Sequence, residues 1–176
     1  MDGETSYTPT EAEAIAATRD WYFDMLRRRL TSAKAMIFPL LTGAAFLLLF
    51  WEPGDGPRSI STRFAEGAAF GVIALCAIWG LSYLLLVPRA RHLFRQIKAR
   101  EGLHRWQWDQ VGFELTTPNG NVRYTWVELH RIVEGRHAFL LFFHDRHYIA
   151  LPRGVLTPAQ ERSFVAASGA DAGARA

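Results

Sequence analysis

The chain has 176 residues, a formal net charge of +3 and an isoelectric point of about 9.3. This length would suit one medium-sized soluble domain, but two long apolar runs occupy much of the first half and must be assigned before a soluble core is counted. The single cysteine, Cys76, excludes an intramolecular disulfide.

The segment before the apolar runs, residues 1–34, is predicted to be a cytoplasmic amphipathic helix. Thr8 can cap the helix, Pro9 suits its first turn, and Glu11 lies three residues after Thr8, as in a capping box. Apolar residues then recur at helical spacing, and three arginines follow them. We expect this helix to lie along the membrane surface or against the C-terminal domain.

The two apolar runs predict a transmembrane helical hairpin over residues 35–88, with spans at about 35–51 and 67–87. The second run has no charged residue and, as a helix, matches a bilayer core of roughly 30 Å. The first run is at the short end of the spanning range and carries Pro39, which suggests a kink. The cationic residues that flank the runs on their terminal sides are Arg27, Arg28, Arg29, Lys34, Arg89, Arg91, Arg95, Lys98 and Arg100. By the positive-inside rule, we expect a multi-pass protein with both termini in the cytoplasm.

Other interpretations of the runs are weaker. Buried helices of a soluble bundle would have the same Gly, Ala and Leu content, but the flanking charge argues against them. Glu66 could mark a transport path, yet it lies at the boundary of the second run, where its carboxylate can reach water. A cleavable signal peptide is not expected, because acidic residues precede the first run. Gly67-x-x-x-Gly71 matches a helix-dimerisation pattern, so a homo-oligomer formed through the transmembrane helices is a further expectation.

After the membrane hairpin, residues 89–103 predict a basic juxtamembrane helix and residues 104–168 a cytoplasmic β domain. Two strand hairpins are expected in this domain, one around Asn119-Gly120 and one around Asp145 and Arg146. A short helix should follow, with Thr157 as its cap, Pro158 in its first turn and Gln160 in a capping box. Residues 169–176 are expected to be a disordered tail.

The polar stretch between the two hairpins predicts a bend rather than a catalytic or metal site. The spacing of Glu128, His130, Glu134 and His137 fits no compact zinc motif. His144 and His147 could form a weak cross-strand metal pair, but a third ligand is missing from the pattern, so no metal, cofactor or catalytic residue is predicted. The residues expected in the core of the β domain are Phe113, Trp126, Leu129, Ile132, Leu141 and Phe143.

The order of motifs resembles a known family. The patterns W-x-W-D-x-x-G-F, Y-T-W-x-x-L-x-x-I-V-E and I-A-L-P-R, placed after a two-span hairpin, are similar to the YcxB-like family of small bacterial membrane proteins. The resemblance covers roughly residues 8–166 and is most specific at Trp126, Glu134, Pro152 and Arg153. It implies an α+β membrane protein in the bacterial inner (cytoplasmic) membrane, with a small antiparallel, pleckstrin-homology-like β domain and a short C-terminal helix. It implies no substrate.

The function expected from these features is a non-enzymatic interaction or regulatory module with an unknown protein partner. The alternative is recognition of anionic lipid headgroups by Arg89, Arg91, Arg95, Lys98 and Arg153. A membrane-associated hydrolase is a remote alternative, because Ser163 and Ser168 come late in the chain without an organised histidine. Nucleic-acid binding is not expected, since the positive charge gathers at the membrane flanks, as topology alone requires.

Overall fold

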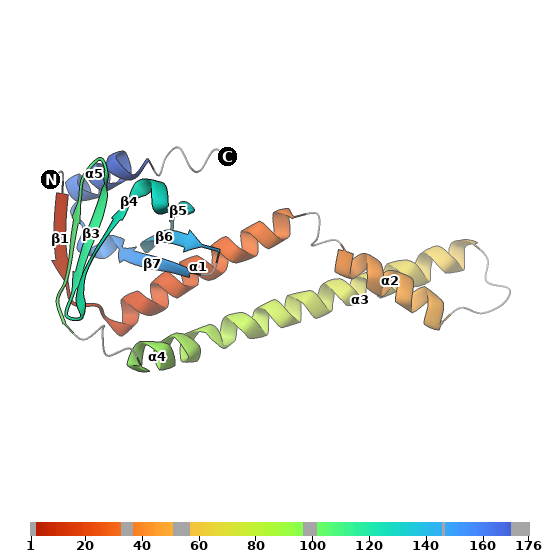
Figure 1. Cartoon of the computed structure of the whole chain (residues 1–176). Helices are drawn as coiled ribbons and strands as arrows, with labels where there is room; N and C mark the ends of the chain where they lie inside the picture. The colour runs from red at the N-terminus through yellow and green to blue at the C-terminus, as the bar shows by residue number, and fades with distance from the viewer. Residues whose placement is uncertain (1–2, 33–36, 51–56, 97–101, 146, 170–176) are drawn as a thin grey trace. The chain divides into compact units, whose positions relative to one another are not determined.

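The computed structural model describes residues 3–32, 37–50, 57–96, 102–145 and 147–169 (Figure 1). The fold is α+β, with helices followed by antiparallel sheets and a C-terminal helix. Two compact units are present. One unit combines Met1–Asp24 with Leu86–Ala176, and the other is Met25–Leu85. Parts of the predicted segments 1–34, 35–51, 89–103 and 169–176, as well as Lys98 and Arg146, lie outside the described residues.

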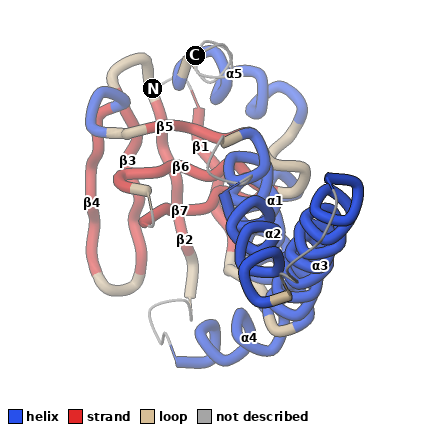
Figure 2. The backbone as a smooth tube through the Cα atoms, turned by 90° about the vertical axis from the view of Figure 1, so that its right-hand side faces the viewer, coloured by secondary structure: helices blue, strands red, loops and turns tan. Residues whose placement is uncertain are grey.

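The first unit contains two antiparallel sheets. Sheet A has the order β1 (Gly3–Tyr7), β2 (His104–Trp108), β3 (Gly112–Thr117) and β4 (Gly120–Thr125). Sheet B has the order β5 (Arg131–Glu134), β6 (Ala138–His144) and β7 (His147–Pro152). Figure 2 shows the strands of sheet A running across those of sheet B, so the two sheets enclose a core between them. Both predicted strand hairpins are present, as β3–β4 and β6–β7.

Strand β1 is an element that the sequence analysis did not anticipate. It pairs antiparallel with β2, from Gly3 opposite Trp108 to Tyr7 opposite His104. Helix α1 (Glu11–Thr31) therefore starts later than predicted. The capping box predicted at Thr8 and Glu11 is wrong: the amide of Glu13 donates to Thr10 Oγ1 at 3.2 Å, and the amide of Thr10 donates to Glu13 Oε2 at 2.9 Å. The strand takes up the residues before Thr8, so the β domain includes a segment from the N-terminus.

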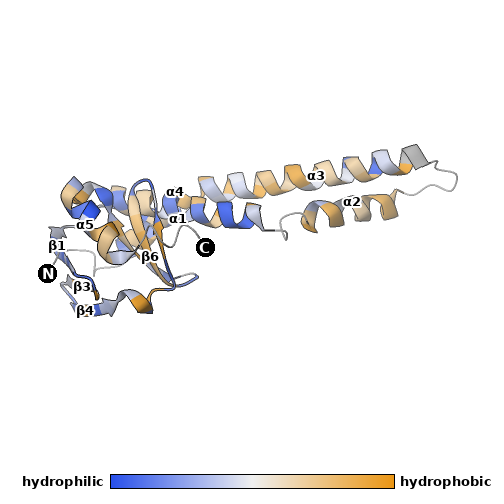
Figure 3. Cartoon of the chain, turned by 90° about the horizontal axis from the view of Figure 1, so that it is seen from above, coloured by the Kyte–Doolittle hydropathy of each residue, from blue (hydrophilic) through white to orange (hydrophobic). Residues whose placement is uncertain are grey.

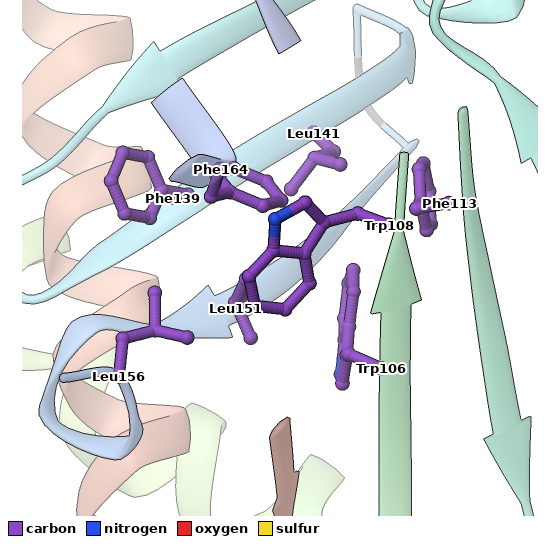
Figure 4. Close-up of a cluster of buried hydrophobic side chains, with 8 residues drawn as sticks. All are labelled: Trp106, Trp108, Phe113, Phe139, Leu141, Leu151, Leu156 and Phe164. Carbon is purple, nitrogen blue, oxygen red and sulfur yellow. The ribbon is translucent and has the colours of Figure 1, made fainter. Parts of the chain in front are cut away.

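The core between the sheets is aromatic. It consists of Trp106, Trp108, Phe113, Phe139, Leu141, Leu151, Leu156 and Phe164 (Figure 4). Phe164 comes from α5 (Pro158–Ser168). Its ring centroid is 5.5 Å from that of Trp108 and 5.0 Å from that of Phe139. The predicted cap of α5 is confirmed, because Thr157 and Gln160 form a capping box and a proline follows at the start of the helix. This cap fixes where α5 begins and thus where Phe164 enters the core.

The six residues expected in the core differ in burial. Phe113 and Leu141 are fully buried, whereas Trp126, Leu129 and Phe143 are partly buried and pack against the cluster. Ile132 is half-buried on β5. The bend predicted between the hairpins is a 3-10 turn, η3 (Trp126–Glu128), in which Thr125 and Glu128 form a capping box. The buried residues Trp106, Trp108 and Phe139 were not in the expected set.

The second unit is helical and apolar. It contains α2 (Ile37–Leu49) and α3 (Pro57–Leu84), which Figure 3 colours as largely hydrophobic. Among the described residues, one helical stretch, Ile60–Gln96, is long and apolar enough to cross a membrane, and α2 is a shorter apolar helix. The two-span hairpin therefore stays a prediction. The end of the long stretch, α4 (Leu86–Gln96), belongs to the first unit.

The glycines of the dimerisation pattern lie against α2 of the same chain. A Cβ at Gly71 would be 2.0 Å from Thr42 Oγ1, and a Cβ at Gly67 would be 2.4 Å from Phe46 Cβ. On the other helix, a Cβ at Gly43 would be 2.9 Å from the ring of Phe64. The small residues thus allow α2 and α3 to approach closely within one chain.

Candidate functional site

The arginines proposed for lipid headgroups are in different local environments. In α4, Arg91 Nε lies 2.9 Å from Glu11 Oε1, and Arg95 lies 3.6 Å from Glu11 Oε2. Arg89 is exposed on the same helix. The apolar side of α4 includes the buried Leu86 and Ala90. The helix therefore presents a basic, water-accessible side, and part of its charge is neutralised by the first turn of α1.

Arg153 connects three elements inside the β domain. Its guanidinium donates to Glu134 Oε1 at 2.9 Å and to the carbonyl oxygen of Gly135 at 3.1 Å, and it also bonds the carboxylate of Glu161 on α5. It lies 5.2 Å from the ring centroid of Phe139. These contacts join the end of β7 to β5 and α5, so Arg153 has a structural position at the sheet.

The other polar candidates also have identifiable contacts. His144 and His147 are opposite each other in the β6–β7 register, and no group of three or more His, Cys, Asp or Glu side chains that could hold a metal ion occurs among the described residues. Ser163 Oγ accepts a hydrogen bond from Trp108 Nε1 at 3.2 Å, and Ser168 Oγ donates to the carbonyl oxygen of Val165 at 3.3 Å. Both serines thus hold local structure around α5.

A buried carboxylate fastens α1 to sheet B. Asp20 is 8% exposed, and its Oδ2 accepts hydrogen bonds from the backbone amides of His137 at 2.6 Å and Ala138 at 3.0 Å. Its Oδ1 lies 3.1 Å from His137 Nδ1. Gly135 makes room for this contact, because a Cβ there would be 2.4 Å from Asp20 Oδ2. The β5–β6 turn therefore forms a small carboxylate-binding site, and α1 supplies the carboxylate.

A second carboxylate contact lies one helical turn further along α1. Asp24 Oδ2 is 2.7 Å from Arg131 Nη1, and both side chains are largely buried. The guanidinium of Arg131 also lies 3.7 Å from the ring centroid of Phe142. Trp21 lies between the two aspartates in sequence, and its ring stacks on that of Tyr148 with 6.3 Å between the ring centroids. Sequence reasoning missed these contacts; the available signal was that Ala17, Asp20, Trp21 and Asp24 share one helix face.

The edges of sheet A are unlike each other. Along β1, the carbonyl oxygen of Glu4 accepts from Gln160 Nε2 at 2.6 Å and Thr5 Oγ1 donates to the carbonyl oxygen of Val155 at 2.9 Å, so η4 (Arg153–Val155) and α5 cover this edge. In the described part of the chain, β4 pairs with β3 alone. Residues 120–123 of β4 are all exposed.

Three exposed valines lie on β4 or near its C-terminal end. Val122 is 47% exposed within the strand, and Val127, just after the strand, is 94% exposed. Val111 is 62% exposed, and its carbonyl oxygen accepts from the amide of Trp126 at 3.1 Å, which places it next to η3. The strand with these three valines is called the β4 edge below. Chemically, it offers main-chain hydrogen bonds together with apolar contacts.

A depression that is open to solvent lies beside α5. Its lining residues are Glu134, Pro158, Glu161, Arg162, Val165 and Ala166. Because it is open to solvent and two of its carboxylates already bind Arg153, it is a weaker ligand site than the β4 edge.

Comparison with known proteins gives a family-model match within the β domain. No curated protein matches the chain. The residues on which the family resemblance rests are all part of the β domain: Trp126 packs against the core, Arg153 bonds Glu134, and Pro152 ends β7. Residues 108–167, which run from the end of β2 into α5, match the family model described as YcxB-like protein, and the resemblance is confirmed over these residues.

Proposed function

We propose that this protein is a non-enzymatic interaction module, anchored in the bacterial inner membrane by a two-helix hairpin, whose cytoplasmic β domain binds a protein partner at the β4 edge. In this proposal the domain is pleckstrin-homology-like and binds a partner segment by strand addition. The anchor is supported by the composition and exposure of α3, where Phe70, Ile73 and Leu84 are each about two-thirds exposed. Side chains of this kind are stable in lipid and unfavourable in water.

The observation that carries the proposal is the difference between the two edges of sheet A. A strand with unpaired main-chain groups is a template for another strand, and natural sheets commonly protect such edges. Here β1 is covered by η4 and α5, whereas β4 is exposed and adjoins Val111 and Val127. Main-chain pairing would give affinity, and the valines would give specificity.

The test is recovery of the partner from native membranes. The full-length tagged chain would be purified in nanodiscs with two variants of the edge, Val122→Lys and Val127→Lys. Leu103→Lys is the matched control, because Leu103 is also exposed but precedes β2. A stoichiometric protein that is lost at least several-fold from both edge variants and retained by the control supports the proposal. Equal recovery with all three variants overturns it, provided that their thermal unfolding is unchanged.

A second candidate function is anionic-lipid binding by α4, with Arg89, Arg91 and Arg95 at the headgroups and Lys98 just beyond the described helix. It is favoured by the amphipathic pattern of α4, on which Leu93 is 47% exposed among basic residues. Quantifying lipids that co-purify with Arg89→Gln and with the control Arg136→Gln tests it. A selective loss of one anionic lipid from the Arg89 variant supports headgroup binding, and identical lipid profiles exclude it.

A further inference from the structure

The first unit is assembled from two separate parts of the chain. Residues 3–24, called the N-terminal segment below, contain β1 and the first part of α1, and they join Leu86–Ala176 only through the whole of Met25–Leu85. The β domain is therefore completed by a segment that the helical unit separates from it along the chain. Such a segment can be supplied by any chain whose N-terminus is close enough.

The strand part of this segment is held by contacts that are specific and mostly polar. β1 pairs with β2 over five residues, and Glu4 Oε2 accepts from Arg105 at 2.8 Å and from Gln107 at 3.1 Å. The pKa of Glu4 is lowered, first by the hydrogen bond from Arg105 and then by that from Gln107. Gly3 fits beneath Trp108, because a Cβ at this position would be 2.4 Å from the indole.

The helix part is held in the same manner. Two carboxylates four residues apart hold this part of α1. Asp20 accepts hydrogen bonds in the carboxylate-binding turn, and Asp24 forms an ion pair with Arg131. The apolar contribution of α1 to this contact comes mainly from Ala17 and Trp21. Buried polar pairs of this kind are weak evidence for stability and can specify the partner and its register. The surface of sheet B thus recognises an Ala-x-x-Asp-Trp-x-x-Asp helix, and the sequence that carries this pattern is the chain itself.

Docking in cis and docking in trans would form identical contacts. Their free energies then differ only through the connection between the segment and its site, that is, through the effective concentration of the segment. The segment's own chain reaches the site only through Met25–Leu85, and confinement of copies by the membrane anchor proposed above raises the local concentration of the others. Exchange of identical elements is a low-cost route to dimers under these conditions.

We propose that two copies of this protein exchange their N-terminal segments, so that β1 and α1 of one copy complete sheets A and B of the other. The partner surface is the β2 edge together with the face of sheet B that carries Arg131 and His137. This dimer is independent of the β4 edge and of the Gly67-x-x-x-Gly71 pattern.

The test relies on the pairing register of β1 with β2, and every chain used in it also carries Cys76→Ala. Ser6 and Arg105 are Cα partners on neighbouring antiparallel strands, and both are exposed. Such partners are about 4.5–5.5 Å apart, within the range that a disulfide spans. A Ser6→Cys chain and an Arg105→Cys chain, with different tags, would be co-expressed and oxidised in native membranes. The control replaces the second chain by Arg123→Cys, on β4.

A disulfide heterodimer several-fold more abundant with Arg105→Cys than with Arg123→Cys supports exchange. Absence of the heterodimer, or equal yields with both chains, overturns it. A single chain that carries both Ser6→Cys and Arg105→Cys shows whether the positions can react: if it forms only an internal disulfide while the split pair forms none, docking is in cis.

Charge reversal gives a second readout that does not depend on thiol chemistry. Asp24→Arg and Arg131→Asp each place like charges together within one chain, whereas two exchanged chains, one with each variant, have an attractive pair at both sites. Co-expression should then raise recovery of the mixed dimer several-fold over wild type, and the double variant in one chain should return to the wild-type level. Recovery of the mixed pair at the wild-type level overturns the proposal.

Discussion

At the residue scale, Asp109 organises the turn between β2 and β3. Its Oδ1 accepts hydrogen bonds from the amides of Gly112 and Val111, both at 2.9 Å. The pKa of Asp109 is lowered from 3.8, first by the amide of Gly112 and then by that of Val111. The folded-state pKa is below the unfolded one, so the carboxylate contributes stability at neutral pH and loses it as the pH falls through the lowered pKa.

Asp109→Asn should therefore be less stable than wild type at neutral pH, and the difference should shrink as the pH falls below the ordinary aspartate range. The amide oxygen of Asn can still accept hydrogen bonds, but it has no charge to strengthen them. Denaturant unfolding of both chains over the acidic pH range measures the effect. A stability difference that is independent of pH would contradict the prediction.

A substitution at Gly135 tests whether the carboxylate-binding turn holds α1. In Gly135→Ala the new Cβ would meet Asp20 Oδ2 at 2.4 Å and the carbonyl oxygen of Ala138 at 2.7 Å. Over-packing of this kind costs about 1–3 kcal/mol. We expect lower stability and faster hydrogen exchange at the amides of His137 and Ala138. Gly154→Ala is the control, because no atom lies within 4 Å of a Cβ there. Equal exchange in both variants would show that α1 does not depend on this turn.

At the element scale, α2 and α3 are held together by small residues. Gly71→Val would place a side chain 2.0 Å from Thr42 Oγ1 and 3.2 Å from Pro39 Cα, so the helices would have to separate. We expect a loss of about 1–3 kcal/mol, measured as a lower unfolding temperature in detergent. Gly80→Val on the same helix should have little effect, because its Cβ would meet no atom within 4 Å. If both variants unfold at the same temperature, the close approach of Gly71 to Thr42 and Pro39 is not the contact that joins these helices.

The elements also show how far the sequence predicts the fold. The β3–β4 hairpin and the cap of α5 were predictable, because Asn119-Gly120 and Thr157-Pro158 act locally. β1 was not, since its polar sequence has no strand pattern and its partner β2 is distant in the chain. The face of α1 that packs on sheet B was not predicted for a related reason. An aspartate at helical spacing is usually solvent-exposed, and only the fold reveals the amides that bind Asp20.

At the scale of the whole molecule, the pairing of β1 with β2 constrains membrane topology. Strands of one sheet must be on one side of a bilayer, so the chain between Tyr7 and His104 must cross it an even number of times. If α3 crosses, a second crossing is required before it. Helix α2 has 13 residues and rises about 20 Å, less than the roughly 30 Å of a hydrocarbon core. Helix α2 by itself is therefore shorter than that crossing requires.

We accordingly expect Ser61 to face the outside of the membrane and both Ser6 and Arg105 to face the cytoplasm. Single cysteines at these positions, in Cys76→Ala background, would be labelled with a thiol reagent that does not cross the bilayer. Ser61→Cys should react in intact spheroplasts, and the other two only after permeabilisation. Labelling of Ser6→Cys and Arg105→Cys on opposite sides would exclude the β1–β2 pairing in the membrane, because one sheet cannot be formed across a bilayer. Labelling of all three on the inside would show that α3 does not cross.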